Sequence, residues 1–250
     1  MARASLRRVA ALLALALVLV PAFARAKDAD AVGRMDGLVR TAEESYRAIR
    51  SYTCTILLRE QHGGKLRALE TIACKFRKPH SVALEWLPPG PYQGLRVSYV
   101  NSRDAEGTFL GREAGFAGLV GAKRYRFAGR FVQTFYPHHY SPAQTNLGFI
   151  IDLAATLYRK AVALGKFRVA SQGRATSPYL KGETDRVEAV LSPDPADGLG
   201  YKRAVLYFDR ATRLPLHLEL YDFEDRLDGL YVFADFAPGV EIPDSAFDLK

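Results

Sequence analysis

The sequence predicts a mainly β protein of the α+β class: a strongly curved antiparallel sheet, or an incomplete β-barrel, with two or more helices across its open side. Most of the chain after residue 50 alternates apolar and polar residues with period two. Turn residues separate these runs at short intervals, which is typical of consecutive antiparallel strands. Only two segments have helical periodicity, and two helices are too few to cover both faces of such a sheet.

Residues 1–26 have the pattern of a secretory signal peptide. Arg3, Arg7 and Arg8 precede an apolar run over residues 9–20, and small residues follow up to Ala26. A membrane anchor is the alternative, but a bilayer span needs roughly 20 apolar residues. We therefore expect cleavage after Ala26, a periplasmic protein whose residues 27–250 form a single domain, and no transmembrane segment after removal of the signal.

Removal of this segment also changes the charge of the protein. Residues 1–26 hold four arginines and no acid, so the net charge falls from +8 to +4. A surplus this small, spread along the chain, does not indicate a nucleic-acid partner.

Two amphipathic helices are expected. The first has apolar residues at three- and four-residue steps from Met35 to Ile49, with charged residues between them. The second begins after Thr145 or Asn146, either of which can cap it, and ends at Gly165.

Strands account for most of the remaining chain. Residues 52–58 and 72–76 place alternate apolar side chains on one face, and Gly63-Gly64 forms the turn of a hairpin between them. Further strands are expected over residues 82–86, 95–100, 205–208, 214–221 and 230–236. Residues 102–141 are rich in glycine and aromatic residues without a clear period, and form either irregular strands or a long loop.

The hairpin register brings the two cysteines together. Placing Cys54 opposite Cys74 also pairs Ile56 with Ile72 on the same face. In an exported protein this predicts a Cys54–Cys74 disulfide, closing a loop of about 20 residues for roughly 3 kcal/mol. Two buried free thiols are the alternative.

Motifs for catalysis, metal binding and phosphate binding are missing from the sequence. There is no Gly-x-Ser-x-Gly, Ser-x-x-Lys or His-Glu-x-x-His. The adjacent His138 and His139 lack further ligands at metal spacing and are interpreted as a surface turn, while His217 is expected to point outward from a strand. The glycines spaced by three over residues 115–121 lack the lysine of a phosphate loop. We therefore expect no enzymatic activity, no metal and no cofactor.

Several strands carry apolar residues on both faces, whereas a strand of an open antiparallel sheet usually has one face in water. One interpretation is that one face packs beneath the helices while the other lines a cavity for an elongated apolar ligand. The other is that both faces pack into an ordinary core. The residues expected to line the cavity are Tyr46, Ile56, Leu58, Ile72, Phe76, Val82, Leu84, Trp86, Ile150, Leu216, Leu218 and Leu220.

Short motifs spread over the chain resemble a known family. The first group is Tyr52-Thr53-Cys54, Lys75-x-Arg77-x-Pro79-x-Ser81-Val82, Trp86-Leu87, Gly94-x-Arg96, Ser98-Tyr99-Val100 and Thr145-Asn146-Leu147-Gly148. It resembles a secreted bacterial family of unknown function, the one numbered fifteen seventy-one. The second group is Phe208-Asp209-x-x-Thr212-x-Leu214-Pro215, Asp222, Tyr231-x-Phe233 and Pro243-x-x-x-Phe247. It resembles the periplasmic lipoprotein carrier LolA and its superfamily.

The resemblance implies an incomplete antiparallel barrel with helical lids over an apolar cavity that takes acyl chains, and it brings no catalytic residues. Cys74 stands where the family often has a charged or polar residue, so the disulfide is not part of the family pattern. We expect a non-enzymatic periplasmic protein that binds a lipid, an acyl chain or a lipoprotein, as a carrier or a sensor. The alternative is a module that binds another envelope protein and takes no lipid.

Overall fold

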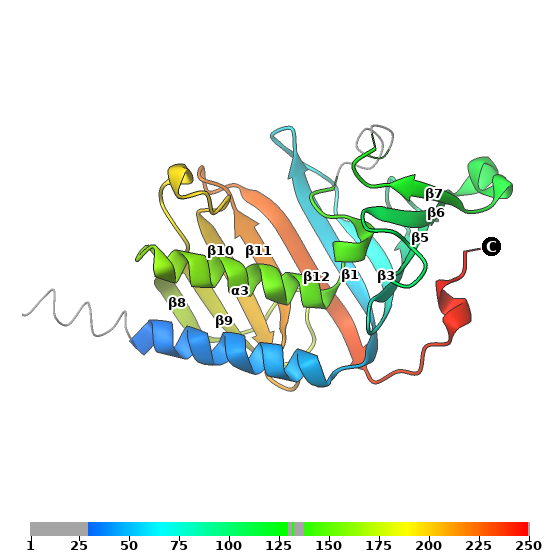
Figure 1. Ribbon diagram of the computed structural model, residues 1–250. Helices are drawn as coiled ribbons and strands as arrows, with labels where there is room; N and C mark the ends of the chain where they lie inside the picture. The colour runs from blue at the N-terminus through cyan, green and yellow to red at the C-terminus, as the bar shows by residue number, and fades with distance from the viewer. Residues whose placement is uncertain (1–29, 130–131, 133–137, 250) are drawn as a thin grey trace, which may run out of the picture.

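The computed structural model describes residues 30–129, 132 and 138–249. The expected signal peptide lies outside the described residues. In the part of the chain that is described, one 12-stranded antiparallel sheet has the order β7-β6-β5-β4-β3-β1-β12-β11-β10-β9-β8, with β2 paired to β1. Its two edge strands are β7 and β8, so the sheet is not closed, and Figure 1 shows helices on one of its faces. The predicted curved, open antiparallel sheet with helices across one side is confirmed.

The strands fall into two groups. The first is β1 (Ser51–His62), β2 (Lys65–Leu66), β3 (Glu70–Arg77), β4 (Ser81–Leu87), β5 (Arg96–Val100), β6 (Thr108–Arg112) and β7 (Lys123–Arg126). The second is β8 (Arg168–Ala175), β9 (Thr184–Val190), β10 (Arg203–Asp209), β11 (Pro215–Tyr221) and β12 (Leu227–Pro238). Short 3-10 helices are η1 (Gly115–Val120), η2 (Pro142–Gln144), η3 (Pro195–Asp197) and η4 (Asp244–Phe247).

The first hairpin has the register that the apolar pattern predicts. Cys54 faces Cys74 and Ile56 faces Ile72 across β1 and β3. Alternate residues of both strands are buried against the helices, because a strand presents every second side chain to the same face.

The predicted disulfide is wrong: Cys54 and Cys74 are both free, buried thiols. Residues directly opposite on antiparallel strands have Cβ atoms about 4.5–5.5 Å apart, whereas a disulfide needs about 3.5–4.5 Å. A correct register therefore does not suffice for the bond. Burial, followed by the neighbouring Cys74 thiol, raises the pKa of Cys54, which keeps that thiol protonated.

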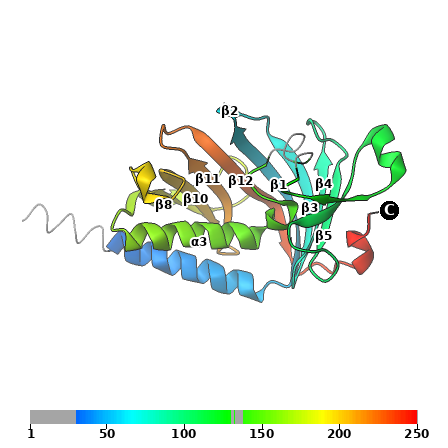
Figure 2. The same cartoon turned by 45° about the horizontal axis from the view of Figure 1, so that its top comes forward.

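Two long helices lie side by side over β8–β12 (Figure 1, Figure 2). The first covers residues 30–48, and the second, α3, is Leu147–Ala163. The Asn146 side chain caps α3 by accepting a hydrogen bond from the Phe149 amide at 3.1 Å, so Asn146 is the cap of the two residues that the sequence offers. The Tyr158 hydroxyl donates to the Val32 carbonyl at 3.1 Å and so joins the two helices. No helix among the described residues has both the length and the apolar character needed to cross a membrane.

Gly148 sets how closely the helices approach each other. A Cβ atom at this position would stand 2.5 Å from the Tyr46 hydroxyl oxygen and 2.7 Å from its ring. Only a glycine lets the Tyr46 ring lie against the first turn of α3.

Candidate ligand groove

An apolar groove of about 530 Å³ opens on the concave face at the β5–β7 end of the sheet. The helices in Figure 1 lie over the other half of that face. Strands β5, β6 and β7 supply Val97, Phe109 and Tyr125, and the loop before β5 supplies Tyr92 and Leu95. These residues share the groove because the strand registers place them on one face: Phe109 pairs directly with Tyr125, and their rings stack 5.8 Å apart.

Polar groups stand at the edges of the groove. The Tyr125 hydroxyl donates to the Glu113 carboxylate at 2.8 Å, and burial together with this carboxylate raises the pKa of Tyr125 to about 12. The Arg67 guanidinium donates to the Tyr92 hydroxyl and lies 5.5 Å from the centre of its ring. The groove therefore combines an apolar floor with a few hydrogen-bonding groups, the usual composition of a small-molecule site.

A second hollow, of about 600 Å³, lies on the opposite face between β1, β3, β4 and the C-terminal segment. Its lining includes the charged residues Lys75, Glu85 and Asp248. Desolvating such groups against an apolar ligand costs free energy. The concave groove is the better candidate for an apolar ligand.

A buried polar cluster adjoins the inner end of the groove. The Glu70 carboxylate accepts a hydrogen bond from Trp86 Nε1 at 2.7 Å, and His138 Nε2 lies 3.1 Å from both of its oxygens. The His138 ring in turn lies 5.7 Å from the ring of Tyr92, which lines the groove. The prediction that His138 belongs to a surface turn is wrong, because its side chain is buried.

Glu60 is the second buried carboxylate of this cluster. It accepts from the Tyr231 hydroxyl at 2.7 Å and from the His139 backbone amide at 3.0 Å. Glu60 and Glu70 are each 4% exposed, and burying a carboxylate is tolerable only when such donors satisfy it. Burial, followed by the charge of Glu60, raises the pKa of Tyr231 far above its ordinary value.

This cluster ties residues 138–140 to the sheet. The void beside Glu60 and His138 has a volume of about 10 Å³, room for about one water molecule. A carboxylate and an imidazole can exchange a proton, but this space does not admit a substrate. Within the described residues, no group of three or more histidine, cysteine or acidic side chains is arranged to hold a metal ion.

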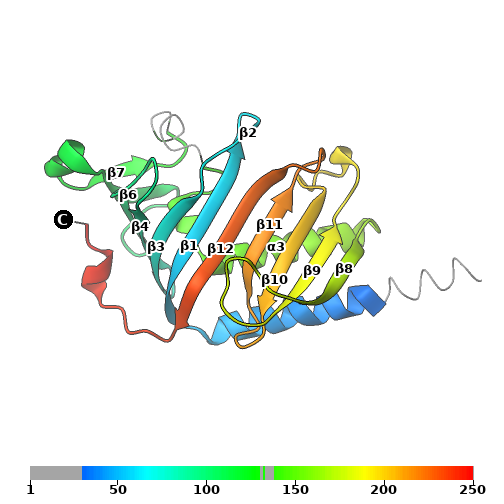
Figure 3. The same cartoon turned by 180° about the vertical axis from the view of Figure 1, so that it is seen from behind.

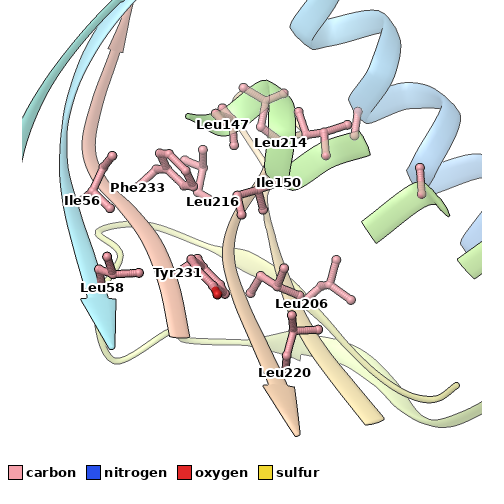
Figure 4. Packing of buried hydrophobic residues seen from close by; sticks show 14 of the residues in the cluster. Ile56, Leu58, Leu147, Ile150, Leu206, Leu214, Leu216, Leu220, Tyr231 and Phe233 are labelled. Atoms are coloured by element: carbon pink, nitrogen blue, oxygen red, sulfur yellow. The ribbon is translucent and has the colours of Figure 1, made fainter. Parts of the chain in front are cut away.

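The twelve residues predicted to line a cavity lie together in one hydrophobic cluster between the sheet and the helices. Figure 4 labels Ile56, Leu58, Ile150, Leu216 and Leu220 of this set in their packing. Two voids that touch members of the set have volumes of about 10 Å³ each. None of the twelve lines the concave groove, which begins beyond them.

The sequence patterns do not predict a polar network that lies on the convex face of the sheet. The segment between β8 and β9 crosses the back of the sheet (Figure 3), where Ser177 Oγ lies 2.9 Å from His217 Nδ1. His217 Nε2 lies 3.0 Å from a Glu219 oxygen. His217 does face outward from β11, as predicted, but this segment buries it completely. Ser177 is buried as well, so the network holds the crossing segment in place.

A family model described as "Protein of unknown function (DUF1571)" matches residues 49–250. The chain belongs to this family. The family membership inferred from the short motifs is thus confirmed for this DUF1571 protein. No curated protein matches the chain.

Solved structures similar to this DUF1571 chain have low sequence identity to it. An uncharacterized conserved protein from Thermus thermophilus is 10% identical, with 86% of this chain and 92% of that chain covered and a TM-score of 0.46. The Mycobacterium tuberculosis lipoprotein LppX is 8% identical, with coverages of 83% and 97% and a TM-score of 0.45. A LolA superfamily protein from Nitrosomonas europaea is 10% identical, with coverages of 85% and 96% and a TM-score of 0.36. At such identities these likenesses say nothing of ligand or partner.

Proposed function

We propose that this protein is exported to the periplasm, where it binds the acyl chain of a lipid or lipoprotein in the concave groove without transforming it. The apolar groove is the observation that carries the proposal. Its volume of about 530 Å³ lies within the range of roughly 300–1,000 Å³ usual for ligand sites. Its aromatic and aliphatic floor favours a hydrocarbon chain, and the polar groups available to a head group are Glu113, which lines the groove, and Arg67, which contacts the lining residue Tyr92.

The twelve residues predicted from the sequence form part of the apolar core between the sheet and the two long helices. They continue the apolar surface of the concave face past the groove. A long acyl chain reaches them if the helices separate from the sheet, whereas a short chain stays in the groove.

The test is the affinity for a fluorescent fatty acid, measured on the purified exported protein. Leu95→Glu places a carboxylate in the groove at a partly exposed position, and we expect at least a tenfold loss of affinity, because an unpaired charge is costly in an apolar site. Leu66→Glu is the matched control, since Leu66 lies on β2 outside the groove lining, and its affinity should stay within twofold of the wild type. Equal affinity of both variants, or no binding by the wild type, rejects the groove as an acyl-chain site.

The alternative is a module that binds another envelope protein and takes no lipid. Lipid extraction and native mass spectrometry of protein purified from its own periplasm separate the two. A bound amphiphile supports the acyl-chain proposal, while a co-purifying protein without any amphiphile supports the alternative.

Export and domain organisation are proposed on the sequence alone. We propose cleavage after Ala26 and a single domain over residues 27–250. The amino-terminal residue of the exported protein should be Lys27, and calorimetry should give one cooperative transition. A retained residue 1, or two separate transitions, contradicts the corresponding statement.

A further inference from the structure

The connection between β6 and β7 carries the most exposed large apolar side chains that the structure describes. Phe116 is 92% exposed, Leu119 75% and Val120 73%, and all three belong to η1. In Figures 1 and 2 this segment projects from the end of the molecule away from the two long helices. We call η1 the hairpin tip. Clustered apolar exposure of this kind marks a binding surface.

The glycines of the tip explain this exposure. Gly115 and Gly121 take positive φ angles of 65° and 85° at its two ends. A Cβ atom on Gly118 would stand 2.1 Å from the Glu113 carbonyl oxygen, so the chain folds tightly against itself there. The Arg112 side chain also donates to the Gly118 carbonyl at 3.2 Å. The glycine motif of residues 115–121 thus forms a turn that holds its apolar side chains outward.

Basic residues flank the tip. Arg112 precedes it, and β7 adds Lys123, Arg124 and Arg126, whereas Glu113 is the one acidic residue among positions 112–126. Arg124 also pairs with Asp104, so part of its charge is compensated. Exposed apolar residues beside basic ones are suited to the surface of an anionic membrane.

The size of the tip argues against a protein partner. It has six residues, whereas a stable protein interface uses about 20–30 residues on each side. Insertion into a bilayer needs no matching surface, because lipids close around the inserted side chains.

We propose that the hairpin tip docks the protein onto an anionic phospholipid bilayer by inserting Phe116, Leu119 and Val120. The groove begins at the base of the tip, since Glu113 and Ala114 line it. Docking therefore brings the mouth of the groove to the membrane surface, where acyl chains are found. The docking itself does not depend on the proposed function, although the route that it offers to an acyl chain does.

Co-sedimentation with lipid vesicles tests this proposal on the purified exported protein. Vesicles of phosphatidylglycerol and phosphatidylethanolamine should bind it, and vesicles of phosphatidylcholine should bind it at least about tenfold more weakly. Phe116→Ser with Leu119→Ser should lower binding to the anionic vesicles at least about tenfold. The matched control is Val162→Ser with Leu164→Ser, at exposed apolar positions by the end of α3, and it should stay within twofold of the wild type.

Lys123→Gln with Arg126→Gln should weaken binding to anionic vesicles and reduce its sensitivity to salt. Each variant is checked for an unchanged melting temperature and for unchanged affinity for the fluorescent fatty acid. The second check separates the two proposals, because a tip variant that still binds the fatty acid has lost docking alone. Wild-type protein that ignores anionic vesicles, or tip variants that bind them normally, overturns the docking proposal. A wild-type protein that forms dimers but does not bind vesicles, together with a tip variant that is monomeric, also overturns the docking proposal and makes the tip a contact between two copies of the protein.

Discussion

Replacing Glu70 with leucine deprives two buried donors of their acceptor at once. Trp86 Nε1 and His138 Nε2 both contact its carboxylate, at 2.7 and 3.1 Å. A buried donor that loses its acceptor costs about 1–3 kcal/mol, so the free energy of unfolding should fall by roughly 2–6 kcal/mol. The value should lie toward the lower end, because the change also removes the cost of burying a charge. Glu70→Gln keeps an acceptor for Trp86 and should cost about 1–2 kcal/mol.

Urea unfolding at pH 7 measures this loss. Trp86 is the single tryptophan of the chain, so its fluorescence reports on this cluster, and far-UV circular dichroism follows the whole sheet. Glu85→Gln is the matched control on the neighbouring strand β4, because the Glu85 side chain is partly exposed and pairs with Arg96 at 2.9 Å. It should change stability by less than about 0.5 kcal/mol. A Glu70→Leu variant as stable as this control refutes the assigned role of the buried carboxylate.

Without reductant, a thiol reagent should label the unfolded protein fully at both Cys54 and Cys74. It should label the folded protein slowly, because both thiols are buried. A pair of cysteines that stays unlabelled after unfolding would contradict the free thiols. Burial raises the pKa of Asp104, but hydrogen bonds from Arg103, the Val100 amide and Arg124 outweigh it, and the net pKa lies below its ordinary value. The contribution of Asp104 to stability is therefore complete above its unfolded pKa of about 3.9 and is lost as pH falls through its folded pKa. In acid titrations, Asp104→Asn should flatten the loss of stability below about pH 4. An unchanged slope would contradict this role of Asp104. Ser177→Ala should lower the free energy of unfolding by about 1–2 kcal/mol, because the contact with His217 is lost. A melting temperature equal to that of the wild type would show that this contact does not hold the crossing segment.

The sequence predicts the centre of the sheet better than its edges. Strands β1, β3 and β4 bury every second residue over most of their length, so their apolar residues alternate clearly. Strands β10–β12 contain runs of consecutive buried residues, and their apolar segments between turn residues predict them as strands. Strand β8 was missed because it is an edge strand with most of its residues exposed, and it has no apolar stripe to detect. Strands β6 and β7 are five and four residues long, too short to show a period.

The buried carboxylates did leave a signal in the sequence. Glu60 falls in phase with Cys54, Ile56 and Leu58 on β1, and Glu70 falls in phase with Ile72 on β3. A carboxylate at a position whose neighbours in phase are all apolar indicates a buried, satisfied charge. The groove left no comparable signal, because its position depends on how far the helices extend over the sheet.

The central claim is that an acyl chain binds in the concave groove, and photo-crosslinking tests it most directly. A fatty acid carrying a diazirine is irradiated with the exported protein, and the modified residues are mapped by mass spectrometry. We predict modification of the peptides that contain Val97, Phe109 and Tyr125, suppressed by excess unlabelled fatty acid. Modification confined to other peptides, or equal to that of heat-denatured protein, would contradict the assignment of this groove as the ligand site.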